Sequence, residues 1–422
     1  MHGQGGHDGH GQVAAEAEVG VADDTPFMTG DKVILLLGLI TYGTGQSILF
    51  ITFPPLVETI GLTITQFGYI MSASFLMLAI ASIYWGRVSD RVGRKPLLMF
   101  GLFGYALGTT LVALSLEWGV RGSPTPLVLF IALLGARMVY SGLASAINPS
   151  ATAYIADTTS RKHRARGMAL MGMSSGFGTL LGPLIGGALV FISAIAPLYF
   201  AAVLAVLACV LIGVKLEEPE RHSAPAHAAN EKLKWSDKRV FPFLIMLIVF
   251  WMGFTMNQII IAFFLEKHVG IETGVEVAKA AASALLSMAF AALIMQGYVM
   301  QRYQIPTRTM FRLGFPTFFI GLAFMYFGTG MWSVWVAFAF LGISMALSNA
   351  GITGGASLSV EAHEQGAVGG LLSAAPILGM CIGPLIGPVL FEQVSPTFPI
   401  LFAMFIFALL SVYGFLVRVP GN

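Results

Sequence analysis

The sequence is short of charge. Of its 422 residues only 10% are Asp, Glu, Lys or Arg, whereas soluble domains carry about a quarter. Too few charged side chains are present to cover the surface of a water-soluble globule of this size. The scarcity therefore excludes a soluble domain, and the net charge of +2 gives no basis for binding nucleic acid.

Cysteine and catalytic motifs are also scarce. The only two cysteines, Cys209 and Cys381, lie inside apolar stretches, which excludes a disulfide framework and a cysteine metal centre. The sequence contains no HExxH, GxSxG, CxxC or phosphate-binding P-loop pattern. We therefore predict that the chain is not an enzyme, holds no cofactor, and takes its energy from an ion gradient rather than from ATP.

What the sequence does contain is long apolar segments. Hydrophobic residues make up 56% of the chain and the mean hydropathy is +0.80. Runs of roughly 20 apolar residues, long enough to cross a bilayer core of about 30 Å, recur throughout. We predict an all-α polytopic membrane protein with twelve spans, at residues 32–58, 65–86, 95–116, 126–156, 167–190, 194–215, 240–265, 277–300, 308–329, 332–357, 367–391 and 396–417.

A polar connection divides these spans into six and six. It is the only internal segment with the composition of a soluble linker. We predict four parts: a disordered, His- and Gly-rich tail at 1–31, a six-helix bundle at 32–215, a cytoplasmic linker at 216–239, and a second, pseudo-symmetric six-helix bundle at 240–418.

Lysine and arginine placement predicts the orientation. Of the 23 basic residues, 19 fall on the side of the two termini, 3 (Arg121, Lys267 and Lys279) on the other side, and Arg137 alone lies within a span. Because basic loops remain in the cytoplasm, we expect both termini to be cytoplasmic. The short loops favour a multi-pass protein of a bacterial inner membrane, and the architecture requires no more than a monomer.

A glycine–proline pattern occurs twice, in spans five and eleven. Both copies fit G-x-x-x-G-P-x-x-G, and they begin 201 positions apart, so they occupy the same place in each half. Glycines four apart let another backbone approach closely, and proline bends a helix. Such a smooth, kinked face suits a contact that rocks, or ordinary close packing. The residues concerned are Gly178, Gly182, Pro183, Gly186, Gly187, Gly379, Gly383, Pro384 and Gly387.

Three segments together resemble a known family. Gly-Arg-Val-Ser-Asp-Arg-Val-Gly-Arg-Lys at 86–95 is similar to the signature loop of the major facilitator superfamily. Arg137 followed by Gly142 resembles its second motif, and the first glycine–proline copy resembles a motif of proton-driven exporters. The best fit is the twelve-helix drug:proton antiporter branch, which implies the major facilitator fold. The chain departs from the pattern at 297–303, where the second half lacks the aspartate of the signature loop.

The resemblance implies roles for the charged residues. Asp90, with Arg91 and Arg94, is expected to lock the two halves together while the transporter faces outward. A plain basic loop that only sets topology is the alternative. A second cluster contains Asp157, followed by Arg161, Arg164 and Arg166, and is either a gate or a topology signal.

Arg137 is the one charge placed deep within a span. An unpaired guanidinium in a bilayer costs about 2.5–3.5 kcal/mol on insertion scales, so it should face the protein interior. The resemblance implies a part in proton coupling or in holding an anionic substrate group, and a structural anchor is the alternative. No acidic residue lies near the middle of a span. The carboxylates available for protonation are peripheral, with Asp90 and Asp157 preferred among Glu58, Asp90, Asp157, Glu266, Glu361, Glu364 and Glu392.

Helical spacing also predicts the lining of a cavity. Polar groups are costly against lipid and should point inward. The predicted substrate-binding residues combine aromatic rings with amides and suit an amphipathic organic molecule: Tyr42, Gln46, Phe50, Arg137, Ser141, Asn148, Trp251, Phe254, Asn257, Gln258 and Asn349.

The N-terminal tail carries three histidines and an aspartate. His2, His7, His10 and Asp8 could bind zinc, copper or nickel weakly, but a glycine-rich disordered tail explains them as well, and we assign no metal site.

These observations favour one function over several others. We predict a proton-coupled exporter of small amphipathic organic compounds such as drugs, working by rocker-switch alternating access. Its partners would be the substrate, protons and the lipid bilayer. The alternatives are a dedicated exporter of an endogenous metabolite such as a siderophore, an uptake transporter for a nutrient or sugar, and a non-transporting sensor.

Overall fold

The computed structural model describes residues 28–122, 124–159, 163–219, 233–272, 274–303, 305–361 and 364–417, without the side chains of 164–166 and 169. The histidine-rich tail and the side chains of Arg161, Arg164 and Arg166 lie outside these described residues.

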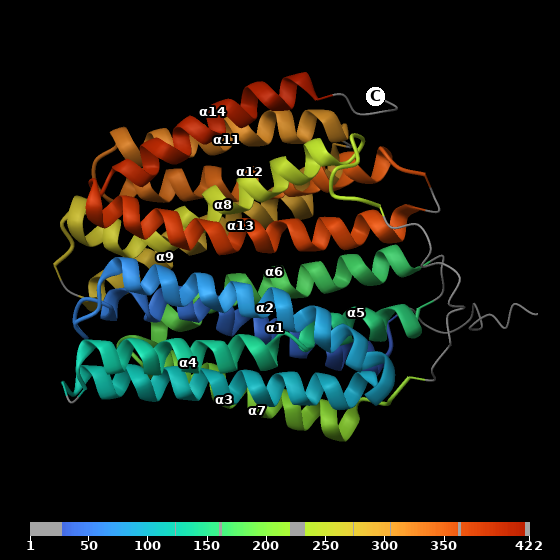
Figure 1. Ribbon diagram of the computed structural model, residues 1–422, viewed down its shortest axis with the longest axis horizontal. Helices are drawn as coiled ribbons and strands as arrows, with labels where there is room; N and C mark the ends of the chain where they lie inside the picture. Colours follow the sequence, from blue (N-terminus) through green and yellow to red (C-terminus); the bar gives the residue numbers. More distant parts are fainter. Residues whose placement is uncertain are drawn as a thin grey trace, which may run out of the picture.

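The described residues form helices and contain no strand. Within this part of the chain, eleven helical segments are long and apolar enough to cross a membrane. The helix of the fifth predicted span is not among these eleven, but it runs beside the first helix over its length (Figure 1). The helices are α1 (Gly30–Thr52), η1 (Pro54–Leu56), α2 (Ile64–Val92), α3 (Arg94–Val120), α4 (Pro126–Ala144), α5 (Ile147–Asp157), α6 (Arg164–Leu189), α7 (Ala196–Lys215), α8 (Phe241–Phe264), η3 (Leu265–Val269), α9 (Gly274–Ile294), η4 (Met295–Val299), α10 (Met300–Arg302), α11 (Thr307–Phe327), α12 (Met331–Leu358), α13 (Gln365–Gln393) and α14 (Phe398–Leu416).

The predicted all-α membrane fold is therefore confirmed, and each predicted span coincides with helix. Span four differs in detail, because it consists of two helices, α4 and α5, separated at Ser145 and Ala146. The face predicted to join Arg137, Ser141 and Asn148 is interrupted by this break.

Local sequence explains where several helices begin. Thr63 and Gln66 form a capping box at the start of α2, each side chain accepting the backbone N–H of the other residue. Proline occupies the second position of α7, α8 and α14, where its missing N–H costs no helical hydrogen bond. These signals place the helix starts at the ends of the apolar runs.

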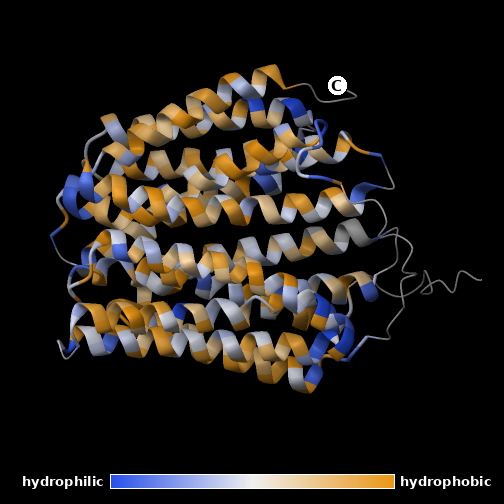
Figure 2. Ribbon diagram, in the orientation of Figure 1, coloured by the Kyte–Doolittle hydropathy of each residue, from blue (hydrophilic) through white to orange (hydrophobic). Residues whose placement is uncertain are grey.

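The helices form two groups that lie one above the other in Figure 1: α1 to α7 and α8 to α14. We call them the first and second groups. The end where α1 begins and α14 finishes, on the right in Figure 1, is the terminal end, and the opposite end is the distal end. Hydrophilic residues gather at these two ends, and apolar residues cover the helices between them (Figure 2). This distribution is that of a multi-pass membrane protein.

Two helix pairs join the groups. Helix α2 of the first group packs against α13 of the second, and α6 packs against α9. A large buried apolar cluster extends through both groups, whereas a smaller one lies wholly within the first group, around Leu35, Leu102 and Ile212.

Candidate functional site

The two glycine–proline copies hold each group together internally. A Cβ atom at Gly178 or Gly182 would collide with the backbone of α1 at Ile40 or Thr44. A Cβ at Gly379 or Gly383 would collide with the backbone of α8 in the same way. Both copies therefore bring a helix into backbone contact with the first helix of its own group.

The later residues of each copy lie nearer the boundary between the groups. A Cβ at Gly187 would lie 3.3 Å from Ala282 of α9. The Pro384 carbonyl lies against Gly68 of α2, where a Cβ would collide with it. Of the remaining members, Pro183 lies inside α6, Gly186 faces Ile48 and Ile51 of α1, and Gly387 faces Met256 of α8.

The polar contacts that join the groups lie in the distal half of the molecule. The Ser72 hydroxyl donates to the Cys381 carbonyl at 2.6 Å, from α2 to α13. Lys267 pairs with Glu58 at 2.8 Å. The Lys279 ammonium of α9 lies 4.1 Å from the centre of the Phe191 ring, in the turn after α6, so the groups are connected at three separate places at this end.

Towards the terminal end the same surfaces are uncovered. Ser72, Ile83 and Asp90 share one face of α2 by helical spacing. Ser72 is buried against α13, but Ile83 is 63% exposed and the Asp90 side chain 70% exposed. On α13, a Cβ at Gly366, Gly369 or Gly370 would meet no atom within 4 Å. The structure is thus closed at the distal end and open towards the terminal end.

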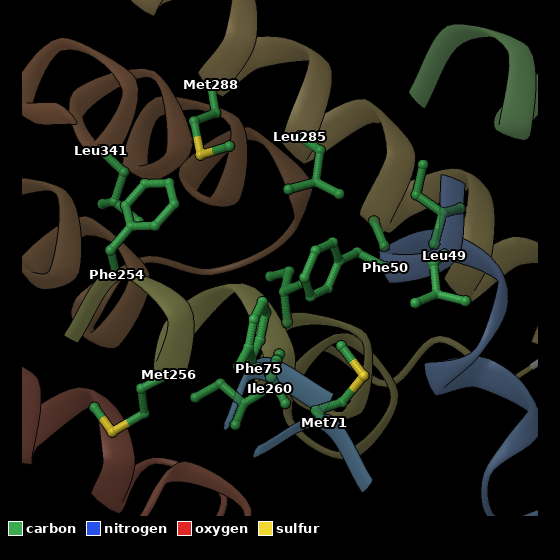
Figure 3. Close-up of a cluster of buried hydrophobic side chains, with 14 of the residues drawn as sticks. Leu49, Phe50, Met71, Phe75, Phe254, Met256, Ile260, Leu285, Met288 and Leu341 are labelled. Atoms are coloured by element: carbon green, nitrogen blue, oxygen red, sulfur yellow. The ribbon is translucent and has the colours of Figure 1, made fainter. Parts of the chain in front are cut away.

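A buried apolar plug closes the distal half between the groups. Leu49, Phe50, Met71 and Phe75 of the first group share a buried cluster with side chains of α8 and α9 of the second, and Leu341 of α12 lies beside Phe254 within the second group (Figure 3). The second group contributes Phe254, Met256, Ile260, Leu285, Met288 and Leu341. The predicted cavity residues Phe50 and Phe254 both belong to this plug and are 8% and 4% exposed.

Arg137 lies in a cage of tyrosines within the first group. It is 2% exposed, and its guanidinium carbon lies 4.4 Å from the centre of the Tyr140 ring. Tyr105 contacts the rings of both Tyr140 and Tyr42, with centroids 5.3 and 5.6 Å apart. The Gln46 amide donates to the Tyr42 hydroxyl at 2.8 Å. Three predicted residues, Tyr42, Gln46 and Arg137, are thus brought to one place.

The cage contains unsatisfied polar atoms. Within the described part of the chain, Arg137 Nε and Nη1 and the hydroxyls of Tyr105 and Tyr140 are buried without a hydrogen-bond partner. Such atoms are costly, and they occur where a protein uses a group or binds water or an ion. Sequence reasoning missed both tyrosines. Tyr140 follows Arg137 by three residues and shares its helix face, a signal that was available.

The two other predicted residues of span four, Ser141 and Asn148, do not lie together. Ser141 forms a short hydrogen bond with Ser74 of α2, beside the cage. Asn148 lies beyond the helix break, on α5, and is exposed.

In the second group the predicted polar residues form a looser set. The Trp251 indole donates to the Asn349 amide oxygen at 3.4 Å, and Trp251 packs edge-on against Phe254. Gln258 is partly exposed. Asn257 is fully buried, and its amide donates to the Gly253 carbonyl one turn back, so this side chain is bound to its own helix.

Arg94 gathers two carboxylates at the terminal end. Its guanidinium donates to Asp157 at 2.9 Å and to Asp90 at 2.8 Å. The backbone N–H groups of Arg94 and Lys95 donate to Glu218. Arg91 is exposed nearby. Every residue in this cluster belongs to the first group or directly follows it.

The second group has a comparable cluster. Arg239 pairs with Asp237 at 2.9 Å and with Glu364, at the start of α13, at 2.7 Å. Hydrogen bonds from Arg239 hold the pKa of the Asp237 carboxyl below its usual value. Sequence reasoning did not pair these residues, which lie 125 positions apart in the case of Arg239 and Glu364.

A lateral pocket of about 490 Å³ lies between α6, α9 and α12. The Trp335 indole donates to the Ser283 hydroxyl, and the Ser287 hydroxyl donates to the Trp335 carbonyl, each at 2.8 Å. Because its polar groups pair with one another, this pocket offers mainly apolar surface. Among the described residues, no group of three or more His, Cys, Asp or Glu could hold a metal ion.

Comparison with protein families gives one match that covers most of the chain. The family model described as the Major Facilitator Superfamily matches residues 35–303 and 272–422. The chain is 26% identical over 385 residues to multidrug resistance protein 2 of Bacillus subtilis, with 89% of this chain and 92% of that protein covered. It is 27% identical over 340 residues to the class B tetracycline resistance protein of Escherichia coli, covering 78% and 80%.

Solved structures share the fold at low sequence identity. A bacterial homologue of the human lysosomal transporter Spinster, in an inward-facing and unoccupied conformation, matches with a TM-score of 0.70 and 14% identity, covering 93% of this chain and 97% of that one. The nucleoside transporter NupG matches with a TM-score of 0.70 and 13% identity, covering 91% and 99%.

Proposed function

The chain belongs to the Major Facilitator Superfamily and is a membrane transporter rather than an enzyme, and from this premise we propose that it exports small amphipathic organic compounds in exchange for protons. The observation that carries the proposal is the joining of two helix groups at one end only. The α2–α13 and α6–α9 contacts close the distal half, whereas the facing surfaces near Asp90 and Gly366 are uncovered. A substrate site between such groups is reached from one side at a time.

Export is the direction supported by sequence likeness. The relatives are named for resistance to multiple drugs, tetracycline and quinolones, and the first glycine–proline copy resembles the exporter motif. With the basic terminal end in the cytoplasm, the structure corresponds to an inward-facing form that accepts substrate from the cytoplasm.

The residues in and beside the plug suit an amphipathic substrate. Phe50 and Phe254 are buried in the plug in this structure and would offer aromatic surface when it opens, while the partly exposed Trp251, Asn349 and Gln258 offer a few polar groups. Binding sites of this kind are mostly apolar, with a small number of polar groups that orient the ligand.

Proton coupling is assigned to the Arg94 cluster. Arg94 holds the carboxylates of Asp90 and Asp157 together, so a proton on either carboxylate weakens its hold on the guanidinium. Asp90 lies at the end of the uncovered face of α2, where Arg94 holds it in this structure, and we expect it to meet α13 when the terminal end closes.

Transport by the Asp90→Asn variant tests this function. In proteoliposomes with an imposed pH gradient, the wild-type chain should move a fluorescent cationic dye or tetracycline against its gradient, and Asp90→Asn should abolish the proton-driven part. Arg121→Gln, a charge change at the distal end, is the matched control and should transport normally. Undiminished proton-driven transport by a normally inserted Asp90→Asn variant contradicts the proposal.

A second candidate function rests on the Arg137 cage. A guanidinium with unpaired N–H groups and, among the described residues, no ion pair to a carboxylate favours an anionic substrate, such as an endogenous acidic metabolite. Comparing secreted metabolites of a deletion strain with its growth on a panel of toxic cations distinguishes the two: loss of one secreted acid with unchanged drug sensitivity supports the second.

A further inference from the structure

One hydrogen bond joins the two groups through a helix end rather than through two side chains. The backbone N–H of Thr65, second residue of α2, donates to the Glu392 carboxylate at 2.9 Å. Glu392 is the penultimate residue of α13 and belongs to the second group. The contact lies at the distal end, where the groups meet.

The start of α2 leaves this N–H in need of an acceptor. The first four N–H groups of a helix have no partner within it. In α2 the capping box satisfies Gln66 through the Thr63 hydroxyl, and Phe67 already donates to the Thr63 carbonyl. Thr65 is left to Glu392. A carboxylate is favoured there, because the N-terminal end of a helix carries partial positive charge.

Helices α2 and α13 run in opposite directions, and each carries an acidic residue near its C-terminal end. Glu392 lies at the distal end of α13, and Asp90 lies at the terminal end of α2. In this structure the distal end is joined by Glu392, while Asp90 and the first turns of α13 are apart. One helix pair thus carries a carboxylate near each end, and in this structure the distal one, Glu392, binds the start of its partner helix.

We propose that Glu392 is the gating residue of the distal end: its carboxylate holds the first turn of α2 while the transporter is open at the terminal end, and it releases Thr65 when the distal end opens. This deepens the proposed transport function and rests on it. Asp90 and Glu392 then act in alternation on the two ends of one helix pair.

The distal ion pair between the groups is less suited to this role. Lys267 and Glu58 are both side chains on the surface, 42% and 39% exposed. Glu392 is exposed as well, but an ion pair between two flexible side chains contributes little to a conformational equilibrium, whereas only one flexible side chain is ordered when Glu392 accepts from a helix backbone. The Thr65 N–H is part of a helix backbone, so its bond to Glu392 reports directly on the position of α2 relative to α13.

Substitution can remove either partner of this bond. Glu392→Gln removes the charge, and Thr65→Pro removes the N–H donor. The chain itself tolerates proline at this helix position, since Pro197, Pro242 and Pro399 are the second residues of α7, α8 and α14. Thr65→Ala keeps the N–H and serves as the matched control for proline. Glu117→Gln is the matched control for charge, because Glu117 binds Arg121 and Tyr199 within the first group.

The test is a distance distribution across the distal end. Spin labels at Thr125→Cys and Thr329→Cys, both exposed in distal loops of different groups, are measured by pulsed electron resonance in nanodiscs. The native cysteines Cys209 and Cys381 are replaced by alanine, which leaves the Cys381 carbonyl in place. Glu392→Gln and Thr65→Pro should each raise the population with a longer distance about two- to fivefold, as expected for one charged contact at a helix end.

The double variant separates a direct contact from two independent effects. If Glu392 acts through the Thr65 N–H, the double variant opens no further than either single variant. An unchanged distribution in Glu392→Gln, or equal effects of Thr65→Pro and Thr65→Ala, overturns the proposal. If Thr65→Pro fails to fold, Glu392→Ala is measured instead, and it should raise the population with a longer distance as Glu392→Gln does.

The measurement needs neither substrate nor a proton gradient. A protein that transports no drug but still opens at the distal end in Glu392→Gln would refute the proposed substrate class and leave the gate intact. A protein that exports drugs while its Glu392 variants keep the closed distance would refute the gate alone.

Discussion

The two groups share an arrangement of helices but differ in what they bury. The first group encloses a guanidinium, three tyrosine rings and the Ser74–Ser141 pair. The second group encloses phenylalanines, among them Phe250, Phe315, Phe318 and Phe407, all without measurable exposure. Phe318 and Phe407 stack with ring centres 3.8 Å apart.

The groups therefore differ in the kind of side chain that they bury, polar in the first and mainly aromatic in the second. Unsatisfied polar atoms in a membrane interior lower stability, so a protein keeps them where they serve its function. Stacked and edge-on aromatic rings stabilise by area and geometry alone. Among the described residues, the second group also buries unpaired polar atoms, at Asn257 Oδ1, Arg308 Nε and Ser348 Oγ, but several of those in the first group gather around one fully buried guanidinium. We therefore propose that the first group carries the coupling chemistry and that the second provides the partner against which it moves.

The largest effect on stability is expected in the aromatic core. Phe318→Ala removes a ring stacked on Phe407 and should lower the free energy of unfolding by about 3–5 kcal/mol. Phe327→Ala, on the same helix but 74% exposed, is the matched control and should change it little. Denaturant unfolding in detergent measures both. Equal losses in the two variants would mean that the stacked rings do not stabilise the second group.

Substitution of Arg137 is expected to raise the free energy of unfolding rather than lower it. Arg137→Met keeps most of the side-chain volume and removes a buried charge with unpaired N–H groups. The free energy of unfolding should rise by about 1–3 kcal/mol, as when hydrophobic residues replace buried ions. Transport in proteoliposomes should fall sharply at the same time.

Arg121→Met, which changes an arginine whose side chain is 70% exposed, should leave both properties near those of the wild type. A loss of stability in Arg137→Met would show that the guanidinium has partners and is a structural anchor.

The smallest effect is expected from single tyrosine hydroxyls within the first group. Tyr140→Phe removes a hydroxyl that lacks a partner in the described part of the chain and should change stability by less than about 0.5 kcal/mol. Tyr154→Phe loses a hydrogen bond to the Glu217 carbonyl and should cost about 0.5–1.5 kcal/mol. Thermal unfolding of the two variants side by side makes the comparison. An equal cost would place a bound water or ion at Tyr140.

Some parts of the site followed from local sequence and others did not. Arg137 was expected to point inward because a lone charge is costly in lipid, and it is buried. Tyr105 was not expected, because it reaches the cage from α3 through space that a Cβ at Gly45 would fill. That contact depends on how α1 and α3 pack, which no single segment encodes.

Residues that lie close together on one helix also contact different parts of the protein. Trp251, Phe254 and Asn257 were predicted to line one cavity. Trp251 meets Asn349, Phe254 enters the plug between the groups, and Asn257 bonds to its own helix. Spacing predicts which residues share a face, but the neighbouring helices decide what that face meets.

The sequence by itself predicted where the membrane-spanning helices lie, to within several residues, and the equivalent places of the two glycine–proline copies. These are local properties, because transfer of an apolar segment into lipid and backbone approach at glycine depend on a few adjacent residues. Only the tertiary structure decided that the groups meet at the distal end, that Arg137 faces tyrosines, and that Glu392 holds the start of α2. Those contacts join residues as far as 327 positions apart, and alternative arrangements of two packed groups differ by only a few kcal/mol, too little to be read from any one segment.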